Sequence, residues 1–354
     1  MQHSYPIQIK DIRRESPDCV SVAFDIPTEL RSDFQFLPGQ YLNIIKTVNG
    51  EELHRSYSLC VSPDIQEWRV AIKKVEGGKF SPFANEILKV GDIVELMIPN
   101  GKFTKPIEAG QKKNYLFIAA GSGITPIMSL ISTILYKEKE SSVCLIYGNT
   151  DFEHIIFRDR ILDLKNIFMH RLQAHFVLSR ELMDEEWFQG RINGEKIKFY
   201  ASKIFQTEVL DEVFICGPET MILDCKKSLM ELGIDSAKIH FELFGTELKP
   251  TIKPIKSFES GKAAKIKLKT DGRTTEFELE YGTKSILDAA LLRKVNLPFA
   301  CKGGVCCTCK AKLLEGEVDM LRNYGLEAEE IEAGFILTCQ SFPKSAHISV
   351  DFDQ

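Results

Sequence analysis

The first 107 residues show short apolar runs of strand length. Residues 41–45 and 68–72 are two of these runs. Turn signals separate the runs at Pro38-Gly39, Asn49-Gly50, Gly77-Gly78, Gly91-Asp92 and Asn100-Gly101. Many short strands at such spacing are typical of a small antiparallel β-barrel, which we therefore predict over residues 1–107.

From Asn114 onward, continuous apolar runs alternate with helical segments. Residues 115–120 are apolar throughout, as in a strand that is covered on both faces. A glycine loop and a helical stretch over 127–137 follow. Further strand-like runs lie at 143–147, 174–178, 213–216 and 239–243, with helical segments such as 219–232 between them. This alternation predicts an α/β domain with a parallel sheet over residues 108–246.

Residues 247–263 are rich in Lys-Pro and Ser/Gly signals and are predicted to form a linker. Beyond them, residues 265–269 and 275–279 flank Asp271-Gly272, which is a strong hairpin signal. Ser285 is a suitable N-cap for a helix that continues to Lys294. Residues 264–354 are therefore expected to form a third, compact domain.

The composition narrows the functional classes. The 354-residue chain is 44% hydrophobic and 27% charged, with a net charge of −5, which gives no reason to expect nucleic-acid binding. The apolar region 115–136 is interrupted by Gly121-Ser122-Gly123 and Pro126, so no membrane span is predicted. Residues 1–6 lack the features of a signal peptide. Ten cysteines without such a signal indicate the reducing cytoplasm, where thiols ligate metals rather than pair.

Four cysteines have the C-x4-C-x2-C…C spacing of plant-type [2Fe–2S] ligation. They are Cys301, Cys306, Cys309 and Cys339. Gly303 and Gly304 are expected to give the loop its positive φ angles and to let backbone N–H groups approach the cluster. A zinc site is the alternative, but zinc sites usually show two short C-x2-C-like pairs. Cys307 is predicted to be a packed thiol that points away from the metal.

Arg55-Ser56-Tyr57-Ser58 matches the R-x-Y-S pattern by which the ferredoxin–NADP reductase family holds a flavin. Arg offers a fork of donors to a phosphate, and a Tyr face can stack on the isoalloxazine. The Ser58 hydroxyl can hydrogen-bond flavin N5. Gly77-Gly78-Lys79-Phe80-Ser81 resembles the segment that binds the FAD pyrophosphate in this family, ahead of a helix expected to open at Pro82-Phe83. The choice of FAD over FMN depends on this resemblance.

Two further segments resemble the NAD(P)H site of the same family. Gly121-Ser122-Gly123-Ile124-Thr125-Pro126 resembles its pyrophosphate loop, with Gly121, Gly123, Thr125 and Pro126 as candidate contacts. Pro126 separates this loop from the G-x-G-x-x-G of ordinary dehydrogenases. Cys216-Gly217-Pro218 resembles the segment that lies beside the nicotinamide. Ser58 and Cys216 are accordingly the candidate catalytic residues.

The preference for NADPH over NADH is predicted from residues near the end of the third parallel strand. Ser179 and Arg180 follow that strand, where the family places ligands of the 2′-phosphate. Arg191 is a further candidate, although an exposed arginine without a ligand is an equally simple explanation. Phe244, beyond the last strand, is expected from the resemblance to cover the isoalloxazine.

The complete order of domains resembles the reductases of multicomponent oxygenases, most closely the phenylacetyl-CoA epoxidase reductases. Segments 301–312, 323–327, 337–341 and 350–353 carry the narrower resemblance. It implies an antiparallel β-barrel flavin domain, an α/β parallel-sheet NAD(P)H domain and an α+β β-grasp ferredoxin domain.

The expected function is an oxidoreductase that passes electrons from NADPH through FAD and a [2Fe–2S] cluster to an oxygenase. A flavin belongs between the other two because NADPH gives electrons in pairs and the cluster takes them singly. Three alternatives stay open: the reductase of another mono-oxygenase or of a Rieske dioxygenase, a general ferredoxin- or flavodoxin-type NADP reductase, and a non-enzymatic zinc or interaction module at the C-terminus.

Overall fold

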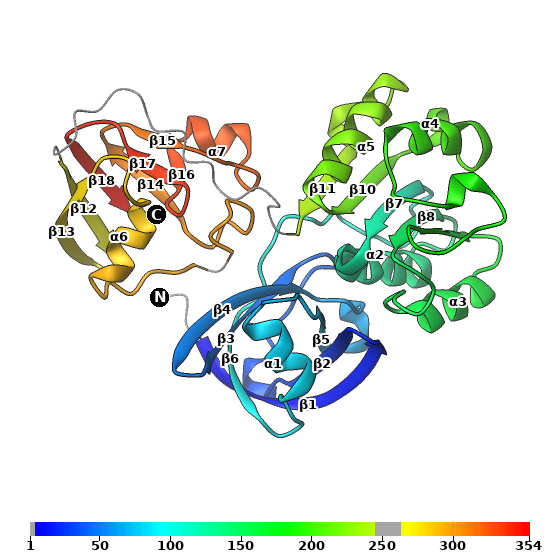
Figure 1. Cartoon of the computed structure of the whole chain (residues 1–354), viewed down its shortest axis with the longest axis horizontal. Helices are drawn as coiled ribbons and strands as arrows, with labels where there is room; N and C mark the ends of the chain where they lie inside the picture. Colours follow the sequence, from blue (N-terminus) through cyan, green and yellow to red (C-terminus); the bar gives the residue numbers. More distant parts are fainter. Residues whose placement is uncertain (1–3, 245–262, 300) are drawn as a thin grey trace. The chain divides into compact units, whose positions relative to one another are not determined.

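The computed structural model describes residues 4–299 and 301–354 except for 245–262. These residues form two compact units, one up to Phe244 and the other from Ala263 (Figure 1). The predicted linker over 247–263 lies outside the described residues except for Ala263, and the predicted domain boundaries stay a prediction. In the part of the chain that is described, no helix is both long enough and apolar enough to span a membrane.

The first unit begins with a six-stranded antiparallel sheet in the order β4-β3-β6-β1-β2-β5. An antiparallel bridge between Leu59 and Val70 joins the end of β4 to β5, so the sheet closes on itself as the predicted barrel. The strands are β1 (Ser4–Ser16), β2 (Cys19–Asp25), β3 (Tyr41–Val48), β4 (Glu51–Ser58), β5 (Trp68–Lys73) and β6 (Ile93–Met97).

Helix α1 (Phe80–Glu86) begins two residues before the predicted start. Phe80 is fully buried and its ring packs on Tyr57, with 5.7 Å between the centroids, which fixes the first turn. Pro82 is tolerated there because the N–H groups of the first turn have no intrahelical acceptor.

A five-stranded parallel sheet follows, in the order β11-β10-β7-β8-β9. β7 lies at its centre, and its neighbours β10 and β8 come from opposite directions in the sequence. Their carboxyl ends therefore meet at a topological switch point, where such sheets bind ligands. The strands are β7 (Asn114–Ala120), β8 (Ser142–Asn149), β9 (Leu172–Leu178), β10 (Glu212–Gly217) and β11 (Ile239–Leu243).

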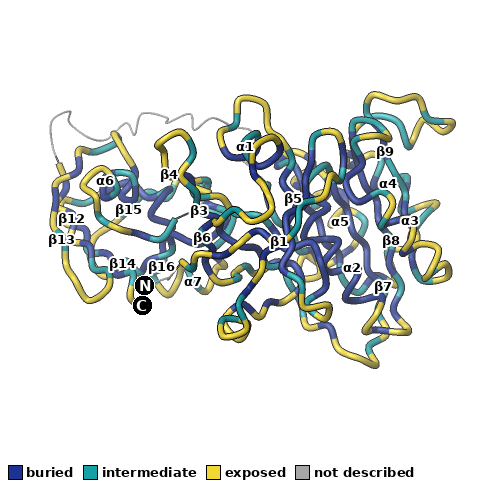
Figure 2. Tube along the Cα trace, turned by 90° about the horizontal axis from the view of Figure 1, so that it is seen from below, coloured by how far each residue is buried: buried dark blue, intermediate teal, exposed yellow. Residues whose placement is uncertain are grey.

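Helices α2 (Ile124–Lys137), α3 (Arg158–Ile167), α4 (Gly194–Lys203) and α5 (Glu219–Glu231) connect these strands. α2 starts three residues earlier than predicted, directly after a 3-10 turn over Gly121–Gly123. It is buried along nearly its whole length (Figure 2).

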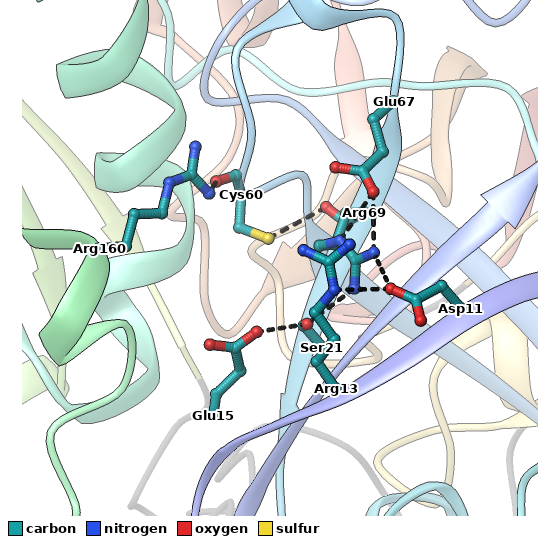
Figure 3. A network of polar contacts seen from close by, with 8 residues as sticks. All are labelled: Asp11, Arg13, Glu15, Ser21, Cys60, Glu67, Arg69 and Arg160. Carbon is teal, nitrogen blue, oxygen red and sulfur yellow. Dashed lines mark hydrogen bonds and ion pairs between the residues drawn. The ribbon is translucent and has the colours of Figure 1, made fainter. Parts of the chain in front are cut away.

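The barrel and the α/β domain share one hydrophobic core and are joined by polar contacts. Ser129 Oγ in α2 donates to Val61 O at 2.6 Å, and Arg160 Nη1 in α3 donates to Cys60 O at 3.1 Å. Figure 3 shows this arginine reaching Cys60, whose Sγ lies 3.2 Å from the backbone oxygen of Arg69. Arg69 pairs with Asp11 and Glu67 within the barrel.

The second unit is built on a five-stranded sheet in the order β13-β12-β18-β14-β16. β12 and β13 form the predicted hairpin, while β12 runs parallel to β18. A two-stranded sheet of β15 and β17 and the helices α6 and α7 complete the β-grasp domain. Its elements are β12 (Ala263–Thr270), β13 (Arg273–Glu280), α6 (Ile286–Leu292), β14 (Lys310–Glu315), β15 (Val318–Met320), α7 (Ala328–Glu332), β16 (Phe335–Leu337), β17 (Ser341–Pro343) and β18 (His347–Asp351).

Helix α6 has the predicted cap but a shorter length. Ser285 Oγ accepts a hydrogen bond from Asp288 N at 3.1 Å. The helix ends at Leu292 instead of Lys294, because Lys294 adopts a left-handed conformation with a φ of 59°.

Candidate cofactor and electron-transfer sites

The flavin motif lies on the last four residues of β4, next to the bridge that closes the barrel onto β5. Arg55 is exposed, and its Nη1 donates only to His54 O among the described residues, so most of its donors are available to an anion. Tyr57 is half-buried against Phe80. Ser58 is buried, and its Oγ lies 3.4 Å from Glu242 Oε2. The strand thus presents a cation, an aromatic face and a hydroxyl within four residues.

The Gly77–Ser81 segment is a tight turn that ends in α1. Gly77 has a φ of 69° and open space where a Cβ would stand, whereas a Cβ on Gly78 would lie 2.9 Å from Val75 O. Ser81 Oγ accepts a hydrogen bond from Val75 N at 3.0 Å and closes the turn. The Phe80 side chain is part of the core, and Lys79 pairs with Glu51. The exposed backbone at Gly77 is therefore the part of this segment that is open to a phosphate.

The glycine loop after β7 packs directly on the end of β10. A Cβ on Gly123 would collide with Cys216 O and would lie 2.5 Å from Cys216 C. Thr125 Oγ1 donates to Ser122 O at 3.0 Å, and Pro126 lies in the first turn of α2. The N–H groups of that turn have no intrahelical acceptors and are suited to a pyrophosphate. The loop and the backbone of Cys216, far apart in the sequence, are thus in direct contact.

Cys216 is fully buried, and desolvation raises the pKa of its thiol well above the ordinary value. A thiol with a raised pKa stays protonated at neutral pH, so Cys216 is no thiolate nucleophile. Cys216 pairs with Glu242 on the neighbouring strand β11. Phe244, just beyond this strand, is half-buried, and its N–H donates to Gly217 O at 3.4 Å.

Glu242 is a further candidate site residue, which the sequence analysis did not predict. Burial raises the pKa of its carboxyl to about 8, opposed by the hydrogen bond with Ser58. It joins Ser58 of the barrel and Cys216 of the parallel sheet. The sequence does hold one sign of Glu242's role, which is an acidic residue within the mostly apolar strand-like run 239–243.

Lys73 is a second missed residue. It ends β5, and its Nζ lies 3.4 Å from Asp18 Oδ2. The same ammonium would be 3.9 Å from a Cβ on Gly121. A cation of the barrel therefore lies against the glycine loop, where it can attract a phosphate.

The candidate 2′-phosphate ligands follow β9. Ser179 N donates to Asn149 O at 2.9 Å, and Arg180 N donates to Thr150 O at 2.7 Å, so the segment continues along the end of β8. Gly190 N donates to Leu178 O at 2.7 Å, so the chain comes back to the end of β9 just before Arg191. Both guanidinium groups are exposed, and neither has a carboxylate partner in the described part of the chain.

The four candidate cluster cysteines form two pairs. The Cys301 and Cys306 thiols interact with each other, as do those of Cys309 and Cys339. The backbone N–H groups of Gly303 and Cys306 donate to Cys301 Sγ at 3.3 and 3.4 Å. Cys301 is exposed, and the other three are buried.

These pairs suit a binuclear cluster. Hydrogen bonding from Cys306 lowers the pKa of Cys301 to about 5, and that from Cys339 lowers the pKa of Cys309. Among the described residues, no three His, Cys, Asp or Glu side chains form a group that would hold a single metal ion. Two irons that each need two thiolates match two pairs of cysteines.

One detail of the cluster loop differs from the prediction. Gly304 has a positive φ of 79°, as expected, but Lys302 and Cys307 take the other left-handed positions with φ of 50° and 53°, and Gly303 does not. Cys307 Sγ lies against Gly325, where an added Cβ would collide with it. This packing agrees with the predicted structural role of Cys307.

Comparisons with known proteins agree with this architecture. An oxidoreductase FAD-binding domain model matches residues 6–104, an oxidoreductase NAD-binding domain model matches 117–227, and a 2Fe-2S iron-sulfur cluster binding domain model matches 268–344. The chain is 40% identical over 349 residues to a 1,2-phenylacetyl-CoA epoxidase component of Escherichia coli (strain K12), covering 99% of this chain and 98% of the relative. The chain belongs to the ferredoxin–NADP reductase family with a C-terminal plant-type ferredoxin domain.

Two further similarities extend over nearly the whole chain. The ferredoxin reductase component of 3-ketosteroid-9-alpha-monooxygenase from Rhodococcus rhodochrous is 28% identical, over 98% of this chain and 96% of its own. The structure of phthalate dioxygenase reductase matches with a TM-score of 0.61 and 23% identity, covering 99% of this chain and 98% of that one. The predicted fold class and the predicted FAD, NAD(P)H and [2Fe–2S] domains are confirmed. The protein is an oxidoreductase that resembles the reductase components of oxygenases.

Proposed function

We propose that this chain takes electrons from NADPH and passes them through FAD and a [2Fe–2S] cluster to the oxygenase of the phenylacetyl-CoA epoxidase system in the cytoplasm. The observation that supports this most is the meeting of Ser58, Cys216 and Glu242. It joins the flavin motif of the barrel to the nucleotide surface of the parallel sheet. A [2Fe–2S] domain on the same polypeptide then provides the single-electron outlet.

FAD would be held by the motif residues of the barrel. The free donors of Arg55 suit a phosphate, and the exposed backbone of the Gly77 turn suits the other phosphate of the pyrophosphate. Tyr57 would support the isoalloxazine from one side. Phe244 would cover it at the edge of the α/β domain until nicotinamide takes that place.

NADPH would lie along the carboxyl edge of the parallel sheet. Gly121–Gly123 and the first turn of α2 would hold the pyrophosphate, with Lys73 contributing a positive charge from the barrel. Gly217 and Pro218 would let the nicotinamide approach. The glycine itself is needed for packing, because an added Cβ would lie 2.7 Å from Met221 Cε and 3.2 Å from Ala120 Cβ.

The bound flavin supplies the conversion between paired and single electrons. Around it, buried Cys216 would exclude water from the nicotinamide side. Glu242, whose pKa is raised to about 8, would carry a proton at neutral pH and hold it beside Ser58 Oγ. Ser58 would then keep a fixed orientation toward the flavin ring.

In the ferredoxin domain, each cysteine pair would hold one iron. Cys301 and Cys306 would bind one, and Cys309 and Cys339 the other. The N–H groups of Gly303 and Cys306 already point at a sulfur and would favour added negative charge there.

The preference for NADPH is tested by Arg180→Ala, because an exposed, unpaired guanidinium beside the nucleotide edge suits a phosphate dianion. The KM for NADPH should rise about tenfold or more, while that for NADH should change little. Arg273→Ala, an exposed arginine of the other unit, is the matched control. Equal changes for both nucleotides would remove the 2′-phosphate role of Arg180.

The acceptor is tested by supplying the NADPH-reduced protein with candidate oxygenase components. The name of the 40% identical relative supports the phenylacetyl-CoA epoxidase. That epoxidase should be reduced fastest and should turn over. Equal or faster reduction of a Rieske dioxygenase component would favour the alternative reductase function.

A further inference from the structure

The three residues 60–62, just beyond the flavin motif, are each hydrogen-bonded to the α/β domain. Arg160 Nη1 of α3 donates to Cys60 O at 3.1 Å, and Ser129 Oγ of α2 donates to Val61 O at 2.6 Å. The third residue uses its hydroxyl, which is hydrogen-bonded to a threonine of α2 at 3.1 Å. We call residues 60–62 the junction segment. All three residues are buried, so these hydrogen bonds are stronger than they would be in water.

The junction segment is also fixed to the barrel. Leu59 forms the bridge with Val70 that closes the sheet. Cys60 N donates to Arg69 O at 2.9 Å, and Cys60 Sγ lies 3.2 Å from the same oxygen (Figure 3). Ser58, the hydroxyl of the flavin motif, lies only two residues before Cys60. A shift of the junction segment would therefore be passed on to the flavin site.

The partners of the junction segment lie on the helix that begins at the nucleotide loop. Ser129, Ser132 and Thr133 are spaced i, i+3 and i+4 along α2, so they share one face of this helix. Arg160 Nη2 donates to Ser132 Oγ at 3.3 Å, which ties the arginine to the same face. α2 starts directly after the Gly121–Gly123 turn. A single helix thus connects the expected pyrophosphate loop to the chain that follows the flavin motif.

Hydrogen bonds and apolar packing do different work at this interface. The barrel and the α/β domain share a hydrophobic core, which holds them together. Apolar packing has no preferred direction, whereas a hydrogen bond requires a narrow range of distances and angles. The contacts of the junction segment therefore fix how the two domains are aligned. Arg160 is the contact that binds both sides at once, because its two Nη atoms reach Cys60 of the barrel and Ser132 of α2.

We propose that Arg160 is a positioning residue for the reduction of the flavin by the nicotinamide. It acts through Cys60 and the end of β4, and it sets the distance between the two cofactors by holding the two domains in one alignment. This inference deepens the proposed function and rests on it.

The test is anaerobic stopped-flow reduction of the flavin over a range of NADPH concentrations, which separates the limiting rate from the Kd. Arg160→Met keeps the length of the side chain and removes its donors. It should lower the limiting rate about tenfold and change the Kd less than about twofold, because each domain keeps its own binding surface. Arg160→Lys can still donate to one acceptor and should recover most of the loss. Arg158→Met is the matched control, because that guanidinium pairs with Asp159 and lies over the Phe152 ring within the α/β domain.

Hydrogen exchange gives a readout that does not depend on the reaction. Amides in the peptide that spans residues 58–62 should exchange faster in Arg160→Met than in the wild type, because the junction segment has lost one of its anchors. The Arg158→Met control should exchange at the wild-type rate in this peptide.

Flavin content and melting temperature show whether each variant is folded. If Arg160→Met does not retain FAD, Thr133→Val decides: it removes only the hydroxyl that contacts Ser62 and should slow flavin reduction about threefold at an unchanged Kd. A limiting rate equal to that of the wild type in the deciding variant would overturn the inference. A loss that Arg158→Met shares, or one that appears only in the Kd, would also overturn it.

The wild type separates this inference from the proposed function. A flavin that NADH reduces and NADPH does not would refute the use of NADPH alone, and the variants would then be compared with NADH. A flavin that neither nucleotide reduces would refute the proposed function and the positioning role together.

Discussion

Replacing Gly123 by alanine should push the glycine loop after β7 away from the end of β10. Its φ of −60° is open to any residue, so Gly123→Ala introduces no backbone strain. In open space, such a change stabilises a protein by about 0.4–1 kcal/mol, because it reduces the conformational freedom of the unfolded chain. Here the added Cβ would lie 2.5 Å from Cys216 C and 2.9 Å from Gly217 N.

The magnitude follows from that overlap. Carbon atoms approach each other to about 3.5–4.0 Å at best, so the loop and the end of β10 must move apart by roughly 1 Å. Overpacking of this size costs about 1–3 kcal/mol of folding free energy and reverses the sign expected from glycine replacement alone. A displacement of about 1 Å at a reacting centre can lower the rate about 100-fold.

The assay is anaerobic stopped-flow reduction of the bound flavin by NADPH, together with thermal unfolding. Gly123→Ala should reduce the flavin about 100-fold more slowly and should melt at a lower temperature. Gly110→Ala is the matched control, because Gly110 has open space but a φ of 89°, so alanine there adds strain without a collision. A Gly123→Ala chain that melts higher than wild type and reduces its flavin at the wild-type rate would refute the packing argument.

Three other predictions concern the cofactors. Cys306→Ser should abolish the iron–sulfur absorbance and leave flavin reduction by NADPH intact, whereas Cys307→Ser should keep the cluster; unchanged absorbance in the first variant would contradict the ligand assignment. Arg55→Ala should lower the FAD content after purification, and a full flavin complement would count against its role at the phosphate. Because burial raises the pKa of Glu242 from 4.5 to about 8, the folded state holds this proton more tightly than the unfolded chain, so stability should decline between about pH 4.5 and 8, and flavin reduction should decline as the pH rises through about 8. Glu242→Gln should make both flat with pH, and a profile that matches wild type would exclude Glu242 as the titrating group.

Sequence patterns predicted the elements of this fold because their signals are local. The apolar run of β7 and the Asp271-Gly272 turn each depend on neighbouring residues, and both were predicted correctly. The ends of helices were less predictable because they depend on packing and backbone conformation. The burial of Phe80 starts α1 two residues before the predicted start, and the left-handed Lys294 ends α6 before the predicted end.

The candidate site was predictable only where its residues form compact motifs. Glu242 and Lys73 each lie in a segment with no motif of its own. They are candidates because the fold brings Glu242 to Ser58 and Lys73 to the Gly121 loop. Such contacts depend on tertiary structure, and spacing along the chain does not reveal them.

The most direct test of the proposed electron path is an anaerobic titration of the purified protein with NADPH, followed by visible absorbance and electron paramagnetic resonance. The oxidised protein should contain one FAD and two irons with two sulfides per chain. NADPH should bleach the flavin band and then produce the signal of a reduced [2Fe–2S] cluster. A protein that binds neither flavin nor iron, or whose cluster stays oxidised after the flavin is fully reduced, would contradict the path from NADPH through FAD to the cluster.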